Sequence, residues 1–249
     1  MTVREPAVRA VCVDLDDTLF AQSEWLAGAW AAVADRAGAL GLDGAALGRV
    51  LTRVAAEGSD RGGIIDRALV AIGVHPEPYV AALVSAFSSH APQRLTPYPG
   101  ALTALDHLQA VVPVVLITDG NPRIQRAKIA ALGLDRRLDH IVISDELGGR
   151  AARKPHPAPF LHALALLREP PARVVHVGDR PAKDVAGAQA VGMRCLRVRT
   201  GEYVDTPDPA GLVPWKTVDS FLEAVELLLP LLETPGPVAR EQPGAVTRL

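Results

Sequence analysis

The chain is organised around the segment Val11-Cys12-Val13-Asp14-Leu15-Asp16-Asp17-Thr18-Leu19, in which three carboxylates follow an apolar run. An apolar run of this kind is typical of a parallel strand that is buried on both faces. Asp14 and Asp16 are two residues apart, so in extended chain their side chains point the same way. Two such carboxylates repel unless a cation lies between them, and oxygen ligands favour Mg²⁺ over Zn²⁺. The segment predicts metal or phosphate chemistry, with a polar turn that caps a helix as the alternative.

The composition limits the size of the core, the partners and the cellular location that we expect. A chain of 249 residues with 49% hydrophobic residues can bury a sizeable core, in one large domain or two unequal ones. Its net charge of -2 gives no reason to expect a nucleic acid or an anionic membrane as a partner. We find no apolar segment suited to a signal peptide or a membrane span and expect a cytoplasmic protein. The scarcity of lysine makes the position of each one informative: Lys128, Lys154, Lys183 and Lys216.

Two regions with different patterns of predicted secondary structure follow the first segment. Residues 22–90 are rich in alanine, have a helical period and are interrupted at glycines, which predicts helices over 24–39, 44–57, 63–72 and 77–89. From Tyr98 onward, helices alternate with apolar strands at the spacing of βαβ units; the predicted strands are 113–118, 140–144, 173–177 and 194–198.

This alternation predicts an α/β fold, a Rossmann-like parallel sheet into which an all-helical cap is inserted after the first strand. The expected division is a catalytic core of residues 1–20 and 96–233, a helical cap of residues 21–95 and a mobile tail of residues 234–249. The tail is rich in proline and glycine and has no periodic apolar face.

The second strand of the core ends in a polar corner. Thr118, Asp119 and Gly120 precede Asn121 and Pro122, so a hydroxyl and a glycine lie next to the first turn of a helix. Such a corner can bind an anion through the Thr118 hydroxyl and the backbone N–H groups that follow it. An ordinary helix cap by Asn121 is the alternative.

Three more charged residues occur at later strand ends. Lys154 stands next to Pro155, which favours a loop at the same sheet edge, where a lysine would neutralise aspartates and a phosphoryl group. Asp179 follows the strand 173–177, with Asp184 five residues later. One of these aspartates could bind a metal while the other orders a ligand water or Lys154. A surface lysine, a helix cap and a helix-dipole contact are the alternatives for these three residues.

In this order, the four motifs at Asp14 to Thr18, Thr118, Lys154 and Asp179 to Asp184 resemble those of the haloacid dehalogenase superfamily. The position of the helical insertion is similar to that of the superfamily's cap between its first and second motifs. The resemblance implies that Asp14 is the nucleophile that forms an aspartyl-phosphate and that Asp16 is the general acid and base.

The same resemblance implies the other ligands. Thr118 and Lys154 would hold the phosphoryl oxygens, with the backbone at Asp119 and Gly120 beside them. Mg²⁺ would be bound by Asp14, by the backbone carbonyl of Asp16 and by Asp179, with Asp184 supporting this group.

Asp16 separates the candidate activities. Halide-releasing members of the superfamily need no general acid and differ from this chain at that position. We therefore expect a Mg²⁺-dependent phosphatase for a small phosphorylated metabolite such as a sugar phosphate, a nucleotide or a phosphoglycolate-like acid. A phosphomutase is the alternative, since it would share all four motifs, and a non-catalytic binding module is a more distant one. The sequence does not indicate an oligomeric state.

Substrate choice is expected to lie in the cap. Residues 58–63 form a flexible break between two predicted helices, and Arg61 in this break could read a carboxylate or hydroxyl of the substrate. Trp25 is a second candidate for substrate specificity. Solvation at the surface is the alternative for Arg61, and packing within the cap is the alternative for Trp25.

Overall fold

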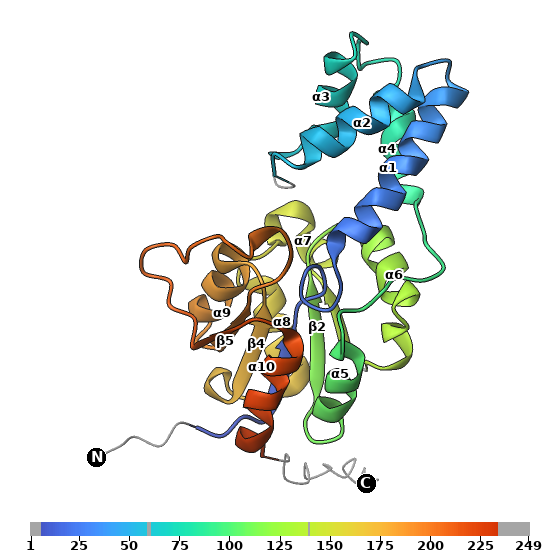
Figure 1. Ribbon diagram of the computed structural model, residues 1–249. Helices are drawn as coiled ribbons and strands as arrows, with labels where there is room; N and C mark the ends of the chain where they lie inside the picture. The colour runs from blue at the N-terminus through green and yellow to red at the C-terminus, as the bar shows by residue number, and fades with distance from the viewer. Residues whose placement is uncertain (1–5, 59–60, 139, 234–249) are drawn as a thin grey trace, which may run out of the picture.

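The computed structural model describes residues 6–58, 61–138 and 140–233, and these include one parallel sheet (Figure 1). Its strands lie in the order β3-β2-β1-β4-β5-β6, and all neighbouring strands are parallel. The strands are β1 (Ala10–Val13), β2 (Val114–Thr118), β3 (His140–Ile143), β4 (Val174–Gly178), β5 (Arg194–Val198) and β6 (Lys216–Val218). The predicted α/β, Rossmann-like sheet is confirmed.

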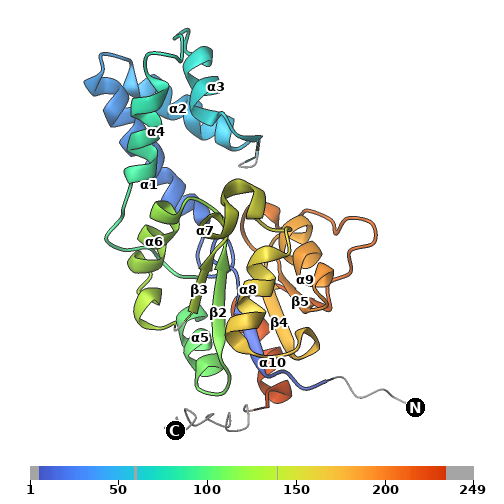
Figure 2. The ribbon, with the colours of Figure 1, turned by 180° about the vertical axis from the view of Figure 1, so that it is seen from behind.

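Helices cover both faces of the sheet because successive strand residues point to opposite sides. Val11 and Val13 of β1 pack in a core with α5 (Ala101–Gln109), α6 (Pro122–Ala131) and α10 (Phe221–Leu228). Ala10 and Cys12 face the other core, which includes residues of α8 (Ala158–Leu167) and α9 (Ala186–Ala190) (Figure 2). Both faces of β1 are therefore buried, as its apolar run predicts.

The helical insertion forms a separate layer beyond the carboxyl ends of the strands (Figure 1). It consists of α1 (Gln22–Ala39), α2 (Gly44–Ala55), α3 (Ile64–Ala71) and α4 (Val80–Ser89). Its helices bury a core of their own that includes Trp30, Leu47, Leu51 and Leu69. The four predicted helices are confirmed, with ends that differ by a few residues.

Some elements differ from the sequence prediction. Strand β6 was not predicted; it has only three residues, and Lys216 and Thr217 are exposed, so it lacks an apolar run. The predicted helix after β4 begins instead with a π-helical turn, Pro181–Val185, before α9. Short α7 (Asp145–Gly148) was also not predicted. The predicted tail, residues 234–249, lies outside the described residues.

Two smaller observations concern helices and thiols. Among the described residues, no helix combines the length and the apolar character that a transmembrane span requires. Cys12 and Cys195 are buried free thiols.

Candidate active site

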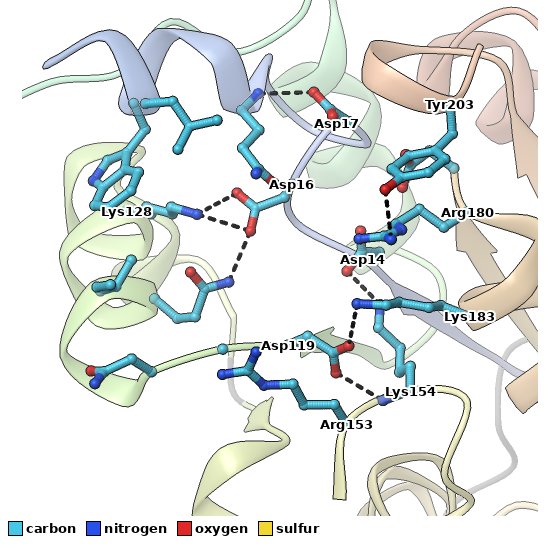
Figure 3. Close-up of a pocket in the computed structure, with 18 of the residues that line it drawn as sticks. Asp14, Asp16, Asp17, Asp119, Lys128, Arg153, Lys154, Arg180, Lys183 and Tyr203 are labelled. Carbon is cyan, nitrogen blue, oxygen red and sulfur yellow. Dashed lines mark hydrogen bonds and ion pairs between the residues drawn. The ribbon is translucent and has the colours of Figure 1, made fainter. Parts of the chain in front are cut away.

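A cavity of about 280 Å³ lies between the carboxyl edge of the sheet and the helical insertion formed by α1 to α4, which is called the cap from here on (Figure 3). Most of the residues singled out from the strand ends line it: Asp14, Asp16, Asp119, Gly120, Lys154 and Asp179. The cap contributes the opposite wall, which includes Trp25, Leu26, Trp30, Ala55, Ile64 and Phe87. Parallel strands bring their carboxyl ends to one edge, and this explains why residues far apart in sequence meet here.

Asp14 comes directly after β1 and is held in place on several sides. Its backbone N–H donates to the Val177 carbonyl (2.9 Å), and its Oδ1 accepts from Lys154 Nζ (2.6 Å). The Thr18 hydroxyl lies 3.5 Å from Oδ2. Burial raises the pKa of Asp14 to about 7 despite Lys154, and Asp184 adds to the rise. The carboxylate therefore needs additional positive charge to stay ionised near neutral pH.

Lys154 is a buried cation shared by two carboxylates. Its Nζ lies 2.6 Å from Asp14 Oδ1 and 2.6 Å from Asp184 Oδ1. Burial opposes the charged form, but Asp14 and Asp184 outweigh it and hold the pKa of Lys154 above its usual value. This lysine is not a solvated surface residue, and its fixed charge adjoins the predicted nucleophile.

Asp179 has the features expected of a metal ligand. Neither of its buried carboxylate oxygens has a hydrogen-bond partner among the residues that the structure describes, and ligand atoms of Asp14, Asp179 and Asp184 lie within 4.8 Å of one another. Burial raises the pKa of Asp179 to about 10, with Asp184 and Asp14 contributing. Crowded, unpartnered oxygens of this kind can hold a divalent cation, and an all-carboxylate set fits Mg²⁺.

Asp184 is bound differently from Asp179. Its Oδ1 contacts Lys154 Nζ and His176 Nε2 (2.8 Å), and its Oδ2 accepts the backbone N–H of Arg180 (3.0 Å). Burial works against ionisation, but Lys154 and the His176 hydrogen bond outweigh it and hold the pKa of Asp184 below its usual value. With its oxygens engaged in this way, Asp184 suits a supporting role, and Asp179 offers the open oxygens.

The predicted phosphate ligands in the corner after β2 differ in their surroundings and in the groups that they can offer. The Thr118 hydroxyl is fully buried and accepts a hydrogen bond from the Gln125 side-chain amide. The Asp119 carboxylate accepts the Lys154 backbone N–H (3.0 Å) and lies 3.3 Å from Lys183 Nζ. A carboxylate would repel a phosphate, so the predictions for Asp119 and Gly120 depend on their backbone N–H groups alone.

Asp16 points away from Asp14 and toward α6 (Figure 3). Lys128 Nζ donates to its two oxygens at 2.7 and 2.9 Å, and Gln125 Nε2 donates to Oδ2 at 3.0 Å. Sequence reasoning missed both partners because they lie in the middle of a predicted helix. The scarcity of lysine was the one available signal for Lys128.

Asp17 connects this loop to two other segments. It has a positive φ of 57° and is buried, and burial raises the pKa of its carboxyl. Its Oδ1 accepts the Gln22 N–H at the start of α1 (2.9 Å), and its Oδ2 accepts the Glu202 N–H (3.2 Å). Gly201 packs so closely that a Cβ atom there would lie 2.0 Å from Asp17 Cγ.

The two cap candidates are placed differently. Trp25 lines the cavity, and its ring lies 4.7 Å from Lys128 Nζ. Arg61 is not among the residues that line the cavity; its side chain is 66% exposed and lies 3.6 Å from Glu57. In this structure Arg61 therefore has the surface environment that was the alternative to substrate recognition.

Further side chains on the core wall were not predicted. Arg180 donates to the Tyr203 hydroxyl (2.8 Å) and stacks on its ring at 4.1 Å. Arg153 donates two hydrogen bonds to Asp145, at 2.6 and 2.7 Å. Arg153, Arg180 and Tyr203 line the cavity from three separate segments of the chain, and no local motif in the sequence joins them.

Comparison with known proteins agrees with the geometry. Residues 8–192 match a family model described as a haloacid dehalogenase-like hydrolase. The glyceraldehyde 3-phosphate phosphatase of Methanopyrus kandleri is 35% identical over 205 residues, which cover 80% of this chain and 87% of that protein. The corresponding phosphatase of Methanocaldococcus jannaschii is 27% identical and covers 89% of this chain and 97% of its own length.

Solved structures share the architecture. The HAD-hydrolase YfnB from Bacillus subtilis, bound to magnesium, has a TM-score of 0.69 at 16% identity and covers 90% of this chain and 99% of its own. The 2-haloacid dehalogenase from Pseudomonas syringae has a TM-score of 0.62 at 26% identity and covers 89% and 98%. On the family match and the Methanopyrus relative together, this chain belongs to the haloacid dehalogenase-like hydrolases.

Proposed function

We propose that this chain is a Mg²⁺-dependent phosphatase that hydrolyses a small phosphorylated metabolite through an aspartyl-phosphate on Asp14. The observation that carries the proposal is the environment of Asp14. This carboxylate lies against the fixed charge of Lys154 and within a cluster with Asp179, whose oxygens have no hydrogen-bond partner in the described part of the chain. Phosphoryl transfer requires positioning and charge neutralisation more than any other contribution from the protein.

Two chemical steps follow from these residues. In the first, an Asp14 oxygen attacks phosphorus, and the bond from phosphorus to the oxygen of the leaving group breaks. Asp16 donates a proton to this leaving-group oxygen. In the second, Asp16 takes a proton from a water whose oxygen attacks the phosphorus. The bond to Asp14 then breaks, inorganic phosphate leaves, and both aspartates return to their starting forms.

The surrounding residues keep these groups in place. Lys154, the Thr118 hydroxyl and the backbone at Asp119 and Gly120 would hold the phosphoryl oxygens. Asp14, Asp179 and the Asp16 carbonyl would hold Mg²⁺, which supplies positive charge where the phosphoryl group gains negative charge. Asp184 supports Lys154, which it contacts at 2.6 Å.

The proposed division of labour assigns this chemistry to the core, residues 1–20 and 96–233, and substrate selection to a cap of residues 21–95. A cavity of about 280 Å³ suits a small leaving group. Similar curated proteins are named for small phosphoesters, among them a phosphoserine phosphatase of Thermus thermophilus and a pyrimidine 5'-nucleotidase of Escherichia coli. We infer a substrate of the same size class.

A panel of phosphorylated metabolites tests the proposal. With Mg²⁺ present, at least one ester should release inorganic phosphate, and Asp14→Asn should abolish that release. Movement of phosphate between positions of a sugar without release would indicate a phosphomutase instead. Release of halide from 2-haloacids, without phosphate release from any ester, would contradict the proposal.

A further inference from the structure

We propose that Lys128 is a positioning residue for this reaction: it holds the Asp16 carboxylate in place and links it to cap helix α1 through Trp25. The inference rests on the proposed function, because Asp16 acts as an acid and base only in that reaction. Lys128 belongs to none of the four motifs that identify the family in this sequence. Its role is inferred from its contacts alone.

The first observation is the way in which Asp16 is held. Lys128 Nζ lies 2.7 and 2.9 Å from the two Asp16 oxygens, and Gln125 Nε2 donates to one of them at 3.0 Å. Gln125 and Lys128 are three residues apart on α6, so they project from the same side of that helix. One helical turn therefore fixes the rotation of the carboxylate as well as its location.

The second observation is the burial of the pair. The side chain of Lys128 is only 5% exposed and that of Asp16 is 18% exposed. A lysine is seldom buried without a paired charge, because removing its ammonium from water is costly. Lys128 therefore differs from a solvated helix lysine, and its ammonium is committed to Asp16.

The third observation is the contact with the cap. The Trp25 ring of α1 lies 4.7 Å from Lys128 Nζ, and the same ring packs edge-on against Phe87 of α4 at 5.1 Å. A cation over an aromatic face is attracted to it, most strongly where water is excluded. The cap thus reaches Asp16 through Trp25 and Lys128, so Trp25 need not contact the substrate to influence turnover.

Each of the two buried lysines of the cavity contacts a different one of the two proposed catalytic carboxylates. Lys154 contacts Asp14, which would form the bond to phosphorus, and Lys128 contacts Asp16, which would transfer the proton. The loss of Lys128 should therefore affect protonation of the leaving group more than attack on phosphorus. Esters whose leaving group departs without a proton should be nearly insensitive to this change.

The test compares two esters in the full-length enzyme with Mg²⁺. One is the best alkyl phosphate from the metabolite panel, and the other is 2,4-dinitrophenyl phosphate, whose leaving group needs no protonation. In Lys128→Met, kcat/KM for the alkyl ester should fall by about 10- to 100-fold, a part of what a general acid contributes. The fall for the aryl ester should stay below about threefold. Lys216→Met, which removes an exposed lysine on β6, is the matched control.

Two further measurements separate positioning from a structural role. Lys128→Arg keeps a cation beside Asp16 and should restore most of the alkyl-ester activity. Inhibition by inorganic phosphate should be unchanged in Lys128→Met, because Lys128 does not hold the phosphoryl group. Trp25→Leu should show the same selectivity for the alkyl ester more weakly, and Trp25→Phe should recover it.

Some results would overturn the inference. An equal loss on both esters, or weaker inhibition by inorganic phosphate, would place Lys128 in phosphoryl binding or in folding. Unchanged activity on both would deny it any role. The ratio of the two kcat/KM values does not depend on the folded fraction, and Lys128→Gln gives the same readout if the Met variant is insoluble. If the wild-type enzyme hydrolyses neither ester, the proposed function fails first.

Discussion

The two walls of the cavity differ in chemical character, one being charged and the other apolar. The core wall carries charged groups that hold one another in place, such as Lys154 with Asp14 and Lys128 with Asp16. The cap wall is mostly apolar, with Leu26, Trp30, Ala55, Ile64 and Phe87 facing the same space. One wall can therefore move charge and protons, and the other can shape the space and exclude water.

This contrast separates the chemistry of the site from its shape. The chemistry of phosphoryl transfer needs a fixed set of charges, and the strand ends of the sheet supply it. Trp25 contacts Lys128 of the core, but Trp30, Ala55 and Ile64 pack in the separate core of the helical layer, so these side chains can change without disturbing the charged wall. Substitutions on the two walls should accordingly differ in kind as well as in size.

The largest effect should come from Asp14→Asn. Asparagine keeps the shape of the side chain but cannot form the aspartyl-phosphate, so kcat should fall by at least about a thousandfold. The variant should remain folded, because burial raises the pKa of Asp14 and so disfavours the charge that the substitution removes. Phosphate release and thermal unfolding measure the two properties, and near-normal turnover would contradict the mechanism.

Lys154→Met should damage both activity and stability. The substitution leaves Asp14 and Asp184 as buried carboxylates without their shared cation, and breaking a buried pair in this way costs roughly 3–5 kcal/mol. Chemical unfolding of the metal-free protein measures the loss of stability. Lys216→Met again serves as the control, and equal stability of the two variants would show that Lys154 is dispensable to the fold.

The stability of the metal-free protein should fall as the pH rises. The folded-state pKa of Asp14 is raised to about 7 and that of Asp179 to about 10, against about 3.9 for an unfolded aspartate. At these two carboxyls the folded state therefore binds more protons than the unfolded state above about pH 4, so their titration makes a further rise in pH favour unfolding. The contribution of Asp14 is lost as the pH rises through about 7, and that of Asp179 through about 10.

Mg²⁺ should reverse this trend, because it replaces the protons on the carboxylates. Thermal unfolding in Mg²⁺ and in a chelator, compared between about pH 5 and pH 8, should show a gap that widens with pH. A gap that stays constant or narrows with pH would argue against a metal site at Asp14 and Asp179.

A smaller and more selective effect is expected on the cap wall. Ile64 lines the cavity at the start of α3, and Ile64→Ala enlarges the space without touching a charge. The ratio of kcat/KM between a large and a small substrate should change by roughly tenfold, because methylene groups in a pocket discriminate on that scale. A uniform loss on all substrates would show that the cap wall takes part in the chemistry.

Arg61→Ala should have the smallest effect. Its side chain is 66% exposed, and its contact with Glu57 is a surface ion pair of little energetic weight. We expect kcat/KM to change by less than about twofold. A large rise in KM would show that Arg61 reaches the substrate when the cap closes.

The sequence predicts the core wall well because its residues stand where apolar strands end. Asp14 and Asp179 each follow a run of buried strand residues and Thr118 ends one, so the order of the strands places them at one edge. The partners of these residues are harder to predict. Lys128 and Gln125 lie inside a helix, and only the three-dimensional packing of α6 against Asp16 distinguishes them from surface residues.

The bonds of Asp17 have a mechanical consequence. The Asp17 carboxylate accepts one N–H from the first turn of α1 and a second N–H from the loop that carries Tyr203. The Thr200 hydroxyl of the same loop donates to the Asp17 carbonyl. The cap and this loop cannot move apart without breaking a bond at Asp17. Any movement that separates α1 from this loop must therefore begin at Asp17, three residues beyond Asp14.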